Sequence, residues 1–508
     1  MKKSFALTIF TFVFALLITL PVAATELHFE EGIFNEKEYH EVIFLTGEPV
    51  LLKGTVTQAG VGGRGKTNNL TTSLTYRLES ADGNIKLNRT ATFTSETEKK
   101  MDGRQTIYNT KLERLSETVT VGKEKFSLSD FQYSRSALLD SQPAVDYFSG
   151  TWTGRKTYTL GKNGTKAVVE VWGDTVGYNH AWGSTETQRI DGTVRFVGDI
   201  VIEGEKQPQE WSGTYQVNLS FNKTRDLTYH PNEPTPISFS GGYIETIQED
   251  AILRYNSNMP EFDKNGLVQD SWGRKYDSGT TRLATMPTQR RLPVPLFRDL
   301  DDHWAREPIL ELASLEAFAP KGDYFGPRLD MTRGEYAYSM SYITDLLSLK
   351  AGQEQQAVNP FESRNKEVVE EESPFSDVGV QHEFYKEIKQ INDAGVMVGV
   401  APGRFAPDST LTRAEAITTL IKALGFEKLA PLQNTITPFN DDDKIPFWAR
   451  DAIYMAAEMG IVAGDTFGNV LPGETMSRAE AATFLQRFVH YLQRDLKTEY
   501  RERLINFR

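Results

Sequence analysis

The sequence contains no cysteine among its 508 residues. This absence excludes disulfide bonds, thiolate metal sites and cysteine nucleophiles together. Histidine is scarce as well, and its seven copies are scattered without a His-x-x-x-His pair, which disfavours a histidine-based metal site. The sequence therefore predicts no bound metal and no cofactor.

Positive charge is also in short supply, because 56 Lys and Arg stand against 69 Asp and Glu, for a formal net charge of -13. A surface this acidic argues against nucleic acid as a partner. With so many carboxylates, the sequence alone cannot single out the close pair that glycosidase chemistry requires. No catalytic constellation stands out, and we expect that the chain is not an enzyme.

A single long apolar run is present, at Ser4–Leu20. Lys2 and Lys3 precede it and the small residues Val22–Ala24 follow it, which is the pattern of a secretory signal peptide. No later segment approaches the ~20 apolar residues that a spanning helix needs. We therefore expect a signal peptide at residues 1–24 and an exported chain without a membrane span after its cleavage.

Residues 25–257 show a hydrophobic period of two, which is typical of half-buried antiparallel strands. Asp82-Gly83 and Asn163-Gly164 lie between such runs and predict two-residue hairpin turns. The expected fold here is all-β and sandwich-like, as one large sandwich or as two smaller domains. The aromatic residues between Trp172 and Trp182 could form a platform for sugar rings, but core positions are favoured for them.

One string in this region imitates a nucleotide-binding loop. Gly60–Thr67 satisfies the P-loop expression G-x-x-x-x-G-K-[ST], whose loop amides and Lys hold phosphates. A P-loop requires a helix after the Lys, whereas the following residues continue as a strand. We interpret the string as a Gly-rich hairpin loop and expect no nucleotide.

A short segment is written three times in the last two fifths of the chain. Each copy carries Ser or Thr three residues ahead of Glu, which is a capping box that begins a helix. The cap pairs are Thr332 and Glu335, Thr412 and Glu415, and Ser477 and Glu480. An arginine follows each cap, at Arg333, Arg413 and Arg478. Free N–H groups and the helix dipole favour an anion at this place.

A Phe-x-Asp phrase precedes each box, so that a unit of roughly 50 residues is repeated three times. These phrases contain Asp299, Asp377 and Asp441. A second helical stretch follows each phrase, beginning with Trp304-Ala305 in the first unit and Trp448-Ala449 in the third. Each unit is therefore expected to be a helix, a turn, a loop and a capped helix.

The ordered string of Phe-x-Asp, Trp-Ala, a Gly-containing turn, Phe-x-Pro and Thr-Arg-Ala-Glu resembles the S-layer homology (SLH) domain. That resemblance implies an all-α pseudo-threefold bundle that anchors a secreted protein to the bacterial cell wall by binding secondary cell-wall polysaccharide. The implied polymer carries a pyruvate-ketal-modified, acidic sugar. Other surface-layer proteins are further implied partners.

By the same resemblance, the polymer would contact a set of residues in the repeats. Arginine side chains would hold the sugar carboxylate, aspartates would orient hydroxyls or the groove wall, tryptophans would pack beside the sugar, and glycines would permit close approach. The set is Arg333, Arg413, Arg478, Asp299, Asp377, Asp441, Trp304, Trp448, Gly395 and Gly460. An alternative stays open in which each box arginine pairs with a carboxylate across the interface between repeats.

The resulting domain plan divides the chain at changes of period and composition. It is a signal peptide at 1–24, an all-β region at 25–257, a linker at 258–296, repeat one at 297–349, an acidic linker at 350–374, repeat two at 375–426, a linker at 427–438, repeat three at 439–492 and a tail at 493–508. The anchored β region would serve a structural or binding role. A wall-anchored polysaccharide- or peptide-active enzyme is the alternative.

Overall fold

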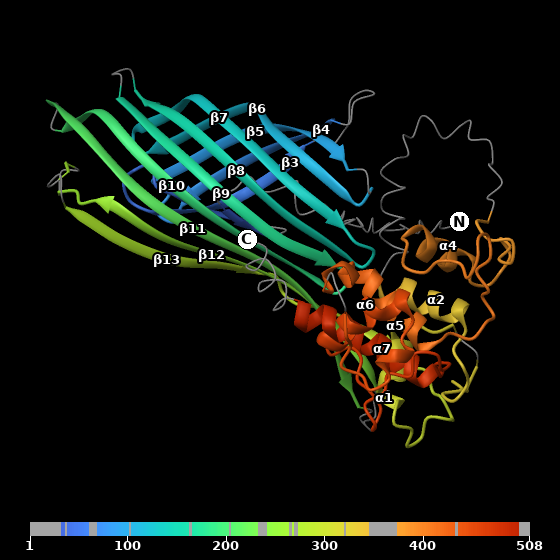
Figure 1. Cartoon of the computed structure of the whole chain (residues 1–508). Coiled ribbons are helices and arrows are strands. Elements are labelled where there is room, and N and C mark those ends of the chain that lie inside the picture. Colours follow the sequence, from blue (N-terminus) through green and yellow to red (C-terminus); the bar gives the residue numbers. More distant parts are fainter. Residues whose placement is uncertain are drawn as a thin grey trace, which may run out of the picture.

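The computed structural model describes residues 32–35, 38–59, 69–100, 103–161, 165–202, 205–231, 241–263, 267–268, 273–319, 322–344, 373–431 and 435–496. The expected signal peptide, the Gly60–Thr67 string, the Asn163-Gly164 turn and nearly all of the acidic linker lie outside the described residues. A curved sheet fills one end of the molecule and a group of helices fills the other (Figure 1).

Within the described residues, fourteen strands form one antiparallel sheet in which β1 to β13 are neighbours in sequence order, with β14 also paired to β12. The strands are β1 (Gly32–Phe34), β2 (Tyr39–Ile43), β3 (Val50–Ala59), β4 (Asn69–Ser80), β5 (Ile85–Lys99), β6 (Gln105–Val121), β7 (Glu124–Ser141), β8 (Val145–Leu160), β9 (Thr165–His180), β10 (Gly183–Ile202), β11 (Glu205–His230), β12 (Gly242–Pro260), β13 (Arg274–Ala284) and β14 (Thr288–Pro293).

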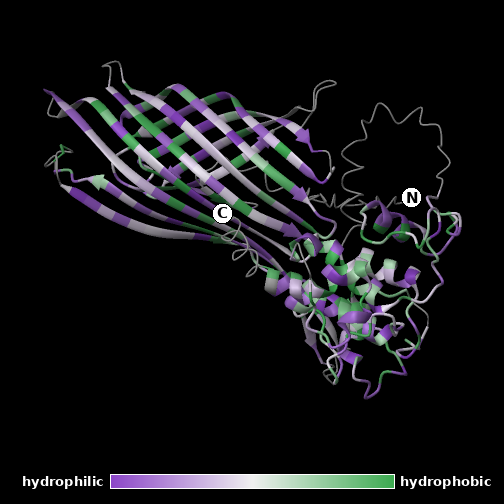
Figure 2. Ribbon diagram, in the orientation of Figure 1, coloured by the Kyte–Doolittle hydropathy of each residue, from purple (hydrophilic) through white to green (hydrophobic). Residues whose placement is uncertain are grey.

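The period-two pattern produces the alternation of buried and exposed side chains along these strands. In β5, for example, Ile85, Leu87 and Ala91 are buried while their neighbours face solvent. The same alternation appears as bands of hydrophobic and hydrophilic residues along the strands in Figure 2. The predicted turn at Asp82-Gly83 joins β4 to β5, with Gly83 at φ 68°.

The prediction of an antiparallel β region followed by helices is confirmed, but a sandwich of two sheets is not what the chain forms. Consecutive hairpins extend one sheet, and its curvature brings the first strands against distant ones. The Phe34 ring in β1 lies 5.6 Å from the Phe221 ring in β11, and Glu41 in β2 reaches Arg89 in β5. The apolar face is therefore covered by other strands of the same sheet.

A buried charge network lies on this covered face. The Arg89 guanidinium donates to Glu41 at 2.8 Å and to Glu117 at 2.6 Å. Tyr158 also donates to Glu117 at 2.7 Å, and the Lys156 ammonium lies 3.4 Å from it. Burial alone would raise the pKa of Glu117, but Arg89 and Lys156 outweigh burial and lower it to about 2.

The second group of elements consists of helices α1 (Arg306–Ser314), α2 (Arg333–Ile343), α4 (Tyr385–Asp393), α5 (Arg413–Leu424), α6 (Phe447–Glu458) and α7 (Arg478–His490), with short turns η1 (Phe426–Leu429), η2 (Asp442–Lys444) and η3 (Tyr491–Asp495). Isolated β-bridges such as Thr332 to Thr410 join the repeats, so this part is not purely helical. Within the described ranges, every helix is too short or too polar to cross a membrane.

The expected linker at residues 258–296 is largely strand in the structure. The end of β12, all of β13 and all of β14 fall within it. Its Arg and Pro residues belong to an edge position of the sheet, where charged side chains and missing N–H donors are tolerated. The sheet therefore continues almost directly into repeat one.

We predict that Arg89→Ala lowers the free energy of unfolding by about 3 to 5 kcal/mol at pH 7, because Glu41 and Glu117 would remain buried without their shared cation. Chemical denaturation measures the loss. Since the folded pKa of Glu117 lies below its ordinary value of 4.5, its contribution in the native protein is present above pH 4.5 and lost as the pH falls toward 2. The deficit of the variant should therefore shrink over that pH range.

The matched control is Arg195→Ala, because Arg195 pairs with Glu210 on the exposed side of the sheet. This variant should leave the free energy of unfolding nearly unchanged. Equal losses for the two variants would contradict the assignment of the stability to the buried network.

Candidate functional site

The three predicted capping boxes are present. In each box the hydroxyl of the cap residue accepts from the backbone N–H of the Glu three residues later, and the carboxylate of that Glu accepts from the backbone N–H of the cap residue. The cap residues are Thr332, Thr412 and Ser477. Helices α2, α5 and α7 begin at these boxes. Each of the three box arginines therefore occupies the first helical position.

The residues just before the boxes close a ring of backbone hydrogen bonds, here called the backbone ring. Met331 N–H donates to Met476 O at 2.8 Å, Leu411 N–H to Met331 O at 2.8 Å, and Met476 N–H to Leu411 O at 2.9 Å. Each repeat therefore donates to one neighbour and accepts from the other. The three box segments meet at one place.

The first two N–H groups of each capped helix are also used inside the molecule. Arg333 N–H donates to Ser409 O at 2.9 Å and Gly334 N–H to Pro407 O at 2.8 Å, both in repeat two. The corresponding donations run from repeat two to Glu474 O and Pro472 O, and from repeat three to Leu329 O and Pro327 O. These amides are the groups that would otherwise favour an external anion.

Each box arginine is buried and pairs with the box glutamate of the next repeat. Arg333 lies 2.6 Å from Glu415, Arg413 lies 2.9 Å from Glu480, and Arg478 lies 2.6 Å from Glu335. This is the pairing that the alternative interpretation of the sequence describes. Contact between these arginines and a ligand stays a prediction.

Aromatic rings complete the surroundings of the guanidinium groups. The central guanidinium carbons lie 4.6 to 5.2 Å from the ring centroids of Phe405, Phe484 and Phe325, a range in which cation–π attraction operates. Burial lowers the pKa of Arg333 in spite of the opposing effect of Glu415.

The carboxylates of the three predicted aspartates accept hydrogen bonds from backbone N–H groups of the loop that precedes each box. Asp377 accepts from Phe405 N–H at 2.9 Å and from Ala406 N–H at 2.7 Å. Asp299 accepts in the same way from Phe325 and Gly326, and Asp441 from Val470 and Leu471. Burial would raise the pKa of Asp299 and Asp377, but these N–H donors lower it overall.

These aspartates hold a left-handed residue in every loop. Ala406 has φ 59° and Leu471 has φ 54°, where a non-glycine residue is strained, while Gly326 has φ 71°. The following Pro407, Pro472 or Pro327 then presents its carbonyl to the neighbouring helix. The sequence carries a signal for this loop as Phe-x-Pro in repeats one and two, but no signal for the left-handed residues Ala406 and Leu471.

The predicted tryptophans are on the surface. Trp304 and Trp448 are 66% and 56% exposed at the start of α1 and α6. Glu383 stands at the matching place of repeat two, just before Phe384, the N-cap residue of α4. Exposed indole rings at equivalent positions of two repeats are available for contact with a ligand.

Gly395 and Gly460 follow α4 and α6 with φ values of 70° and 68°. A Cβ added to Gly460 would meet nothing within 4 Å, so its backbone conformation is what favours glycine there. The matching residue of repeat one is Glu316, at φ 60°. Because repeat one has Glu316 in place of glycine, its sequence carries no signal for the left-handed residue at this turn.

Comparison with known protein families identifies the repeats. A family model described as the S-layer homology domain matches residues 296–337, 374–417 and 438–482. The C-terminal region carries three SLH repeats. The resemblance seen in the sequence is thereby confirmed, including the number of repeats and their order.

Relatives of the chain include an exoglucanase and proteins named for cell-surface roles. An exoglucanase XynX of Acetivibrio thermocellus is 24% identical over 65% of this chain and 31% of its own length. A cellulosome-anchoring protein of the same organism is 31% identical over 22% of this chain and 25% of its own length. A surface-layer 125 kDa protein of Lysinibacillus sphaericus is 24% identical over 44% of this chain and 18% of its own length.

The chain spans 31%, 13% and 9% of the lengths of the exoglucanase, an endoglucanase of a Bacillus strain and an amylopullulanase of Thermoanaerobacterium thermosulfurigenes.

The SLH repeats and the surface-layer and cell-wall relatives identify a secreted protein of the bacterial cell envelope that is anchored at the cell surface.

We predict opposite effects for two substitutions at the matching turn of repeats one and three. Glu316→Gly should raise the free energy of unfolding by about 0.5 to 1 kcal/mol, and Gly460→Ala should lower it by about 1 kcal/mol, because only glycine adopts a positive φ without strain. Thermal and chemical denaturation measure both. Gly473→Ala is the control, since Gly473 lies in open space without a positive φ, and a loss there as large as at Gly460 would refute the argument.

Proposed function

We propose that the three SLH repeats form a pseudo-threefold unit that binds secondary cell-wall polysaccharide without covalent chemistry, and that the sheet is displayed from this anchor. The observation that carries the proposal is the threefold recurrence of the family match together with the cyclic donation among the three boxes. Several weak sites on one chain raise retention through effective concentration.

The chemistry of the exposed residues supports a sugar ligand. Trp304 and Trp448 present indole faces that suit the apolar face of a sugar ring. Among the box arginines, Arg413 keeps 11% of its side chain exposed, compared with 5% for Arg333 and for Arg478. We propose that a pyruvate-ketal carboxylate of the polymer contacts Arg413 beside its pair with Glu480.

The sheet's own role is part of the proposal. We propose a structural or binding role in the envelope, with other surface-layer proteins as partners, and no catalytic activity. Incubation of the full chain with a panel of cell-wall glycans and peptides tests the last point. Turnover of any of them would establish the alternative of a wall-anchored enzyme.

We predict that the full chain co-sediments with purified cell-wall sacculi and that Trp304→Ala/Trp448→Ala weakens this binding by about tenfold, taking each indole–sugar contact to be worth as much as an aromatic pair, about 0.5 to 1.5 kcal/mol. Both side chains are exposed, so the fold should remain intact. Trp172→Ala is the matched control, since Trp172 is 47% exposed on β9 of the sheet. Binding that is unchanged on sacculi stripped of their polymer would refute polysaccharide anchoring.

A further inference from the structure

The sheet rests with one end on the helices. Alternate hairpin turns of an antiparallel sheet fall at the same end, and here the β7–β8 and β9–β10 turns meet the repeats. Buried residues of both parts form one continuous hydrophobic cluster, to which the sheet contributes Ala144, Val145, Tyr178, Trp182, Tyr243 and Leu292. The contact is therefore a shared core, not a tether.

Polar contacts at this end reach repeat one, repeat two and the segment that directly follows repeat three. The Trp182 indole N–H donates to Ile343 O, in the last residue of α2, at 2.9 Å. Ala144 N–H donates to Ala423 O near the end of α5 at 2.8 Å. Gln493, in the turn that follows α7, donates to Arg225 O in β11 at 2.9 Å.

These contacts supply partners to groups that helices leave unpaired. The last four carbonyls of a helix have no acceptor role within it, and buried carbonyls require a donor. The sheet supplies such donors to α2 and α5 from two different turns. It thereby closes the repeats at the carboxyl ends of their helices, opposite the backbone ring at the amino ends.

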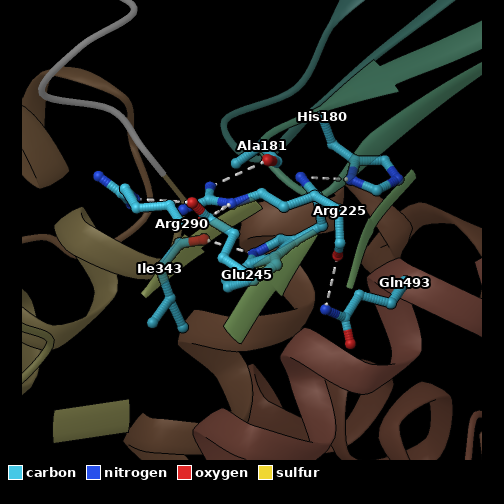
Figure 3. Close-up of polar contacts among 8 residues, drawn as sticks. His180, Ala181, Arg225, Glu245, Arg290, Ile343 and Gln493 are labelled. Atoms are coloured by element: carbon cyan, nitrogen blue, oxygen red, sulfur yellow. Dashed lines mark hydrogen bonds and ion pairs between the residues drawn. The ribbon is translucent and has the colours of Figure 1, made fainter. Parts of the chain in front are cut away.

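The contact surface of the sheet is held in place by its own charged cluster (Figure 3). Glu245 is 3% exposed and accepts from Arg225 at 2.6 Å and from Arg290 at 2.8 Å. The Arg225 guanidinium carbon in turn lies 4.6 Å from the centroid of the Trp182 ring, and its side chain also donates to Ala181 O. The three strands β11, β12 and β14 therefore fix Trp182 for its contact with α2.

We infer that the sheet is a structural platform on which the three SLH repeats assemble, so that the stability of the repeats depends on the docked sheet. The partners that fit the carboxyl ends of α2 and α5 are thus two of the chain's own hairpin turns, while the segment that follows α7 contacts β11. Part of the β region thereby has a role within the anchor, whichever polymer the repeats bind.

Hydrogen exchange of the full chain tests the inference with three variants. Trp182→Ala removes the ring and the donor, Trp182→Phe removes the indole N–H and keeps an aromatic ring, and Gln493→Ala removes the contact to Arg225 O. We expect faster amide exchange in peptides covering α2 and α5, by on the order of a hundredfold for Trp182→Ala and about tenfold for Trp182→Phe. Gln493→Ala should accelerate exchange in α7.

Trp172→Ala is the matched control because it removes an exposed tryptophan from the same strand region, and it should leave helix exchange unchanged. The two milder variants decide the outcome if Trp182→Ala does not fold. Unchanged exchange in α2, α5 and α7 in both of them would overturn the inference. Co-sedimentation with sacculi is measured separately, so that a failure of polysaccharide binding is distinguished from a failure of docking.

Discussion

Buried backbone groups at helix ends must find partners, and this requirement shapes the whole C-terminal region. The free N–H groups of α2, α5 and α7 are paired with carbonyls of the next repeat, the third helix donating back to the first. Because the pairing is cyclic, no repeat can complete its own helix start. The requirement also explains the aspartate-held loops, since Pro327, Pro407 and Pro472 must present their carbonyls at the right place.

The cyclic arrangement also accounts for the box arginines. A guanidinium at a helix start lies beside the positive end of a dipole and needs a carboxylate nearby. The box Glu of the neighbouring repeat supplies it, while the same Glu caps its own helix. Thus Glu415 serves two helices at once. A ligand carboxylate at Arg413 would have to approach from the remaining exposed edge of the guanidinium, beside an existing pair.

Local signals in the sequence predicted the local structure well. The capping boxes and the Asp82-Gly83 turn depend on residues a few positions apart, and all of them are present. Partners far apart in the chain could not be predicted. Period two shows that a strand has one buried face but not what covers it, so the single curved sheet could not be told from a sandwich. Likewise Arg478 and Glu335 are 143 residues apart.

The expected linker and Trp182 show a second limit of prediction from the sequence. The stretch 258–296 is predicted to be a linker because it contains Arg and Pro, yet β13 and β14 within it pair one after the other along the same side of β12. Trp182 was expected in a core, and it is buried between two parts of the chain that the sequence separates into a β region and an anchor. Because the same core contains both, a force applied to the sheet reaches the repeats through packed side chains and a short connection. The shared core therefore couples the sheet to the repeats, and under the proposed anchoring the binding of the repeats to the wall would set the orientation of the sheet.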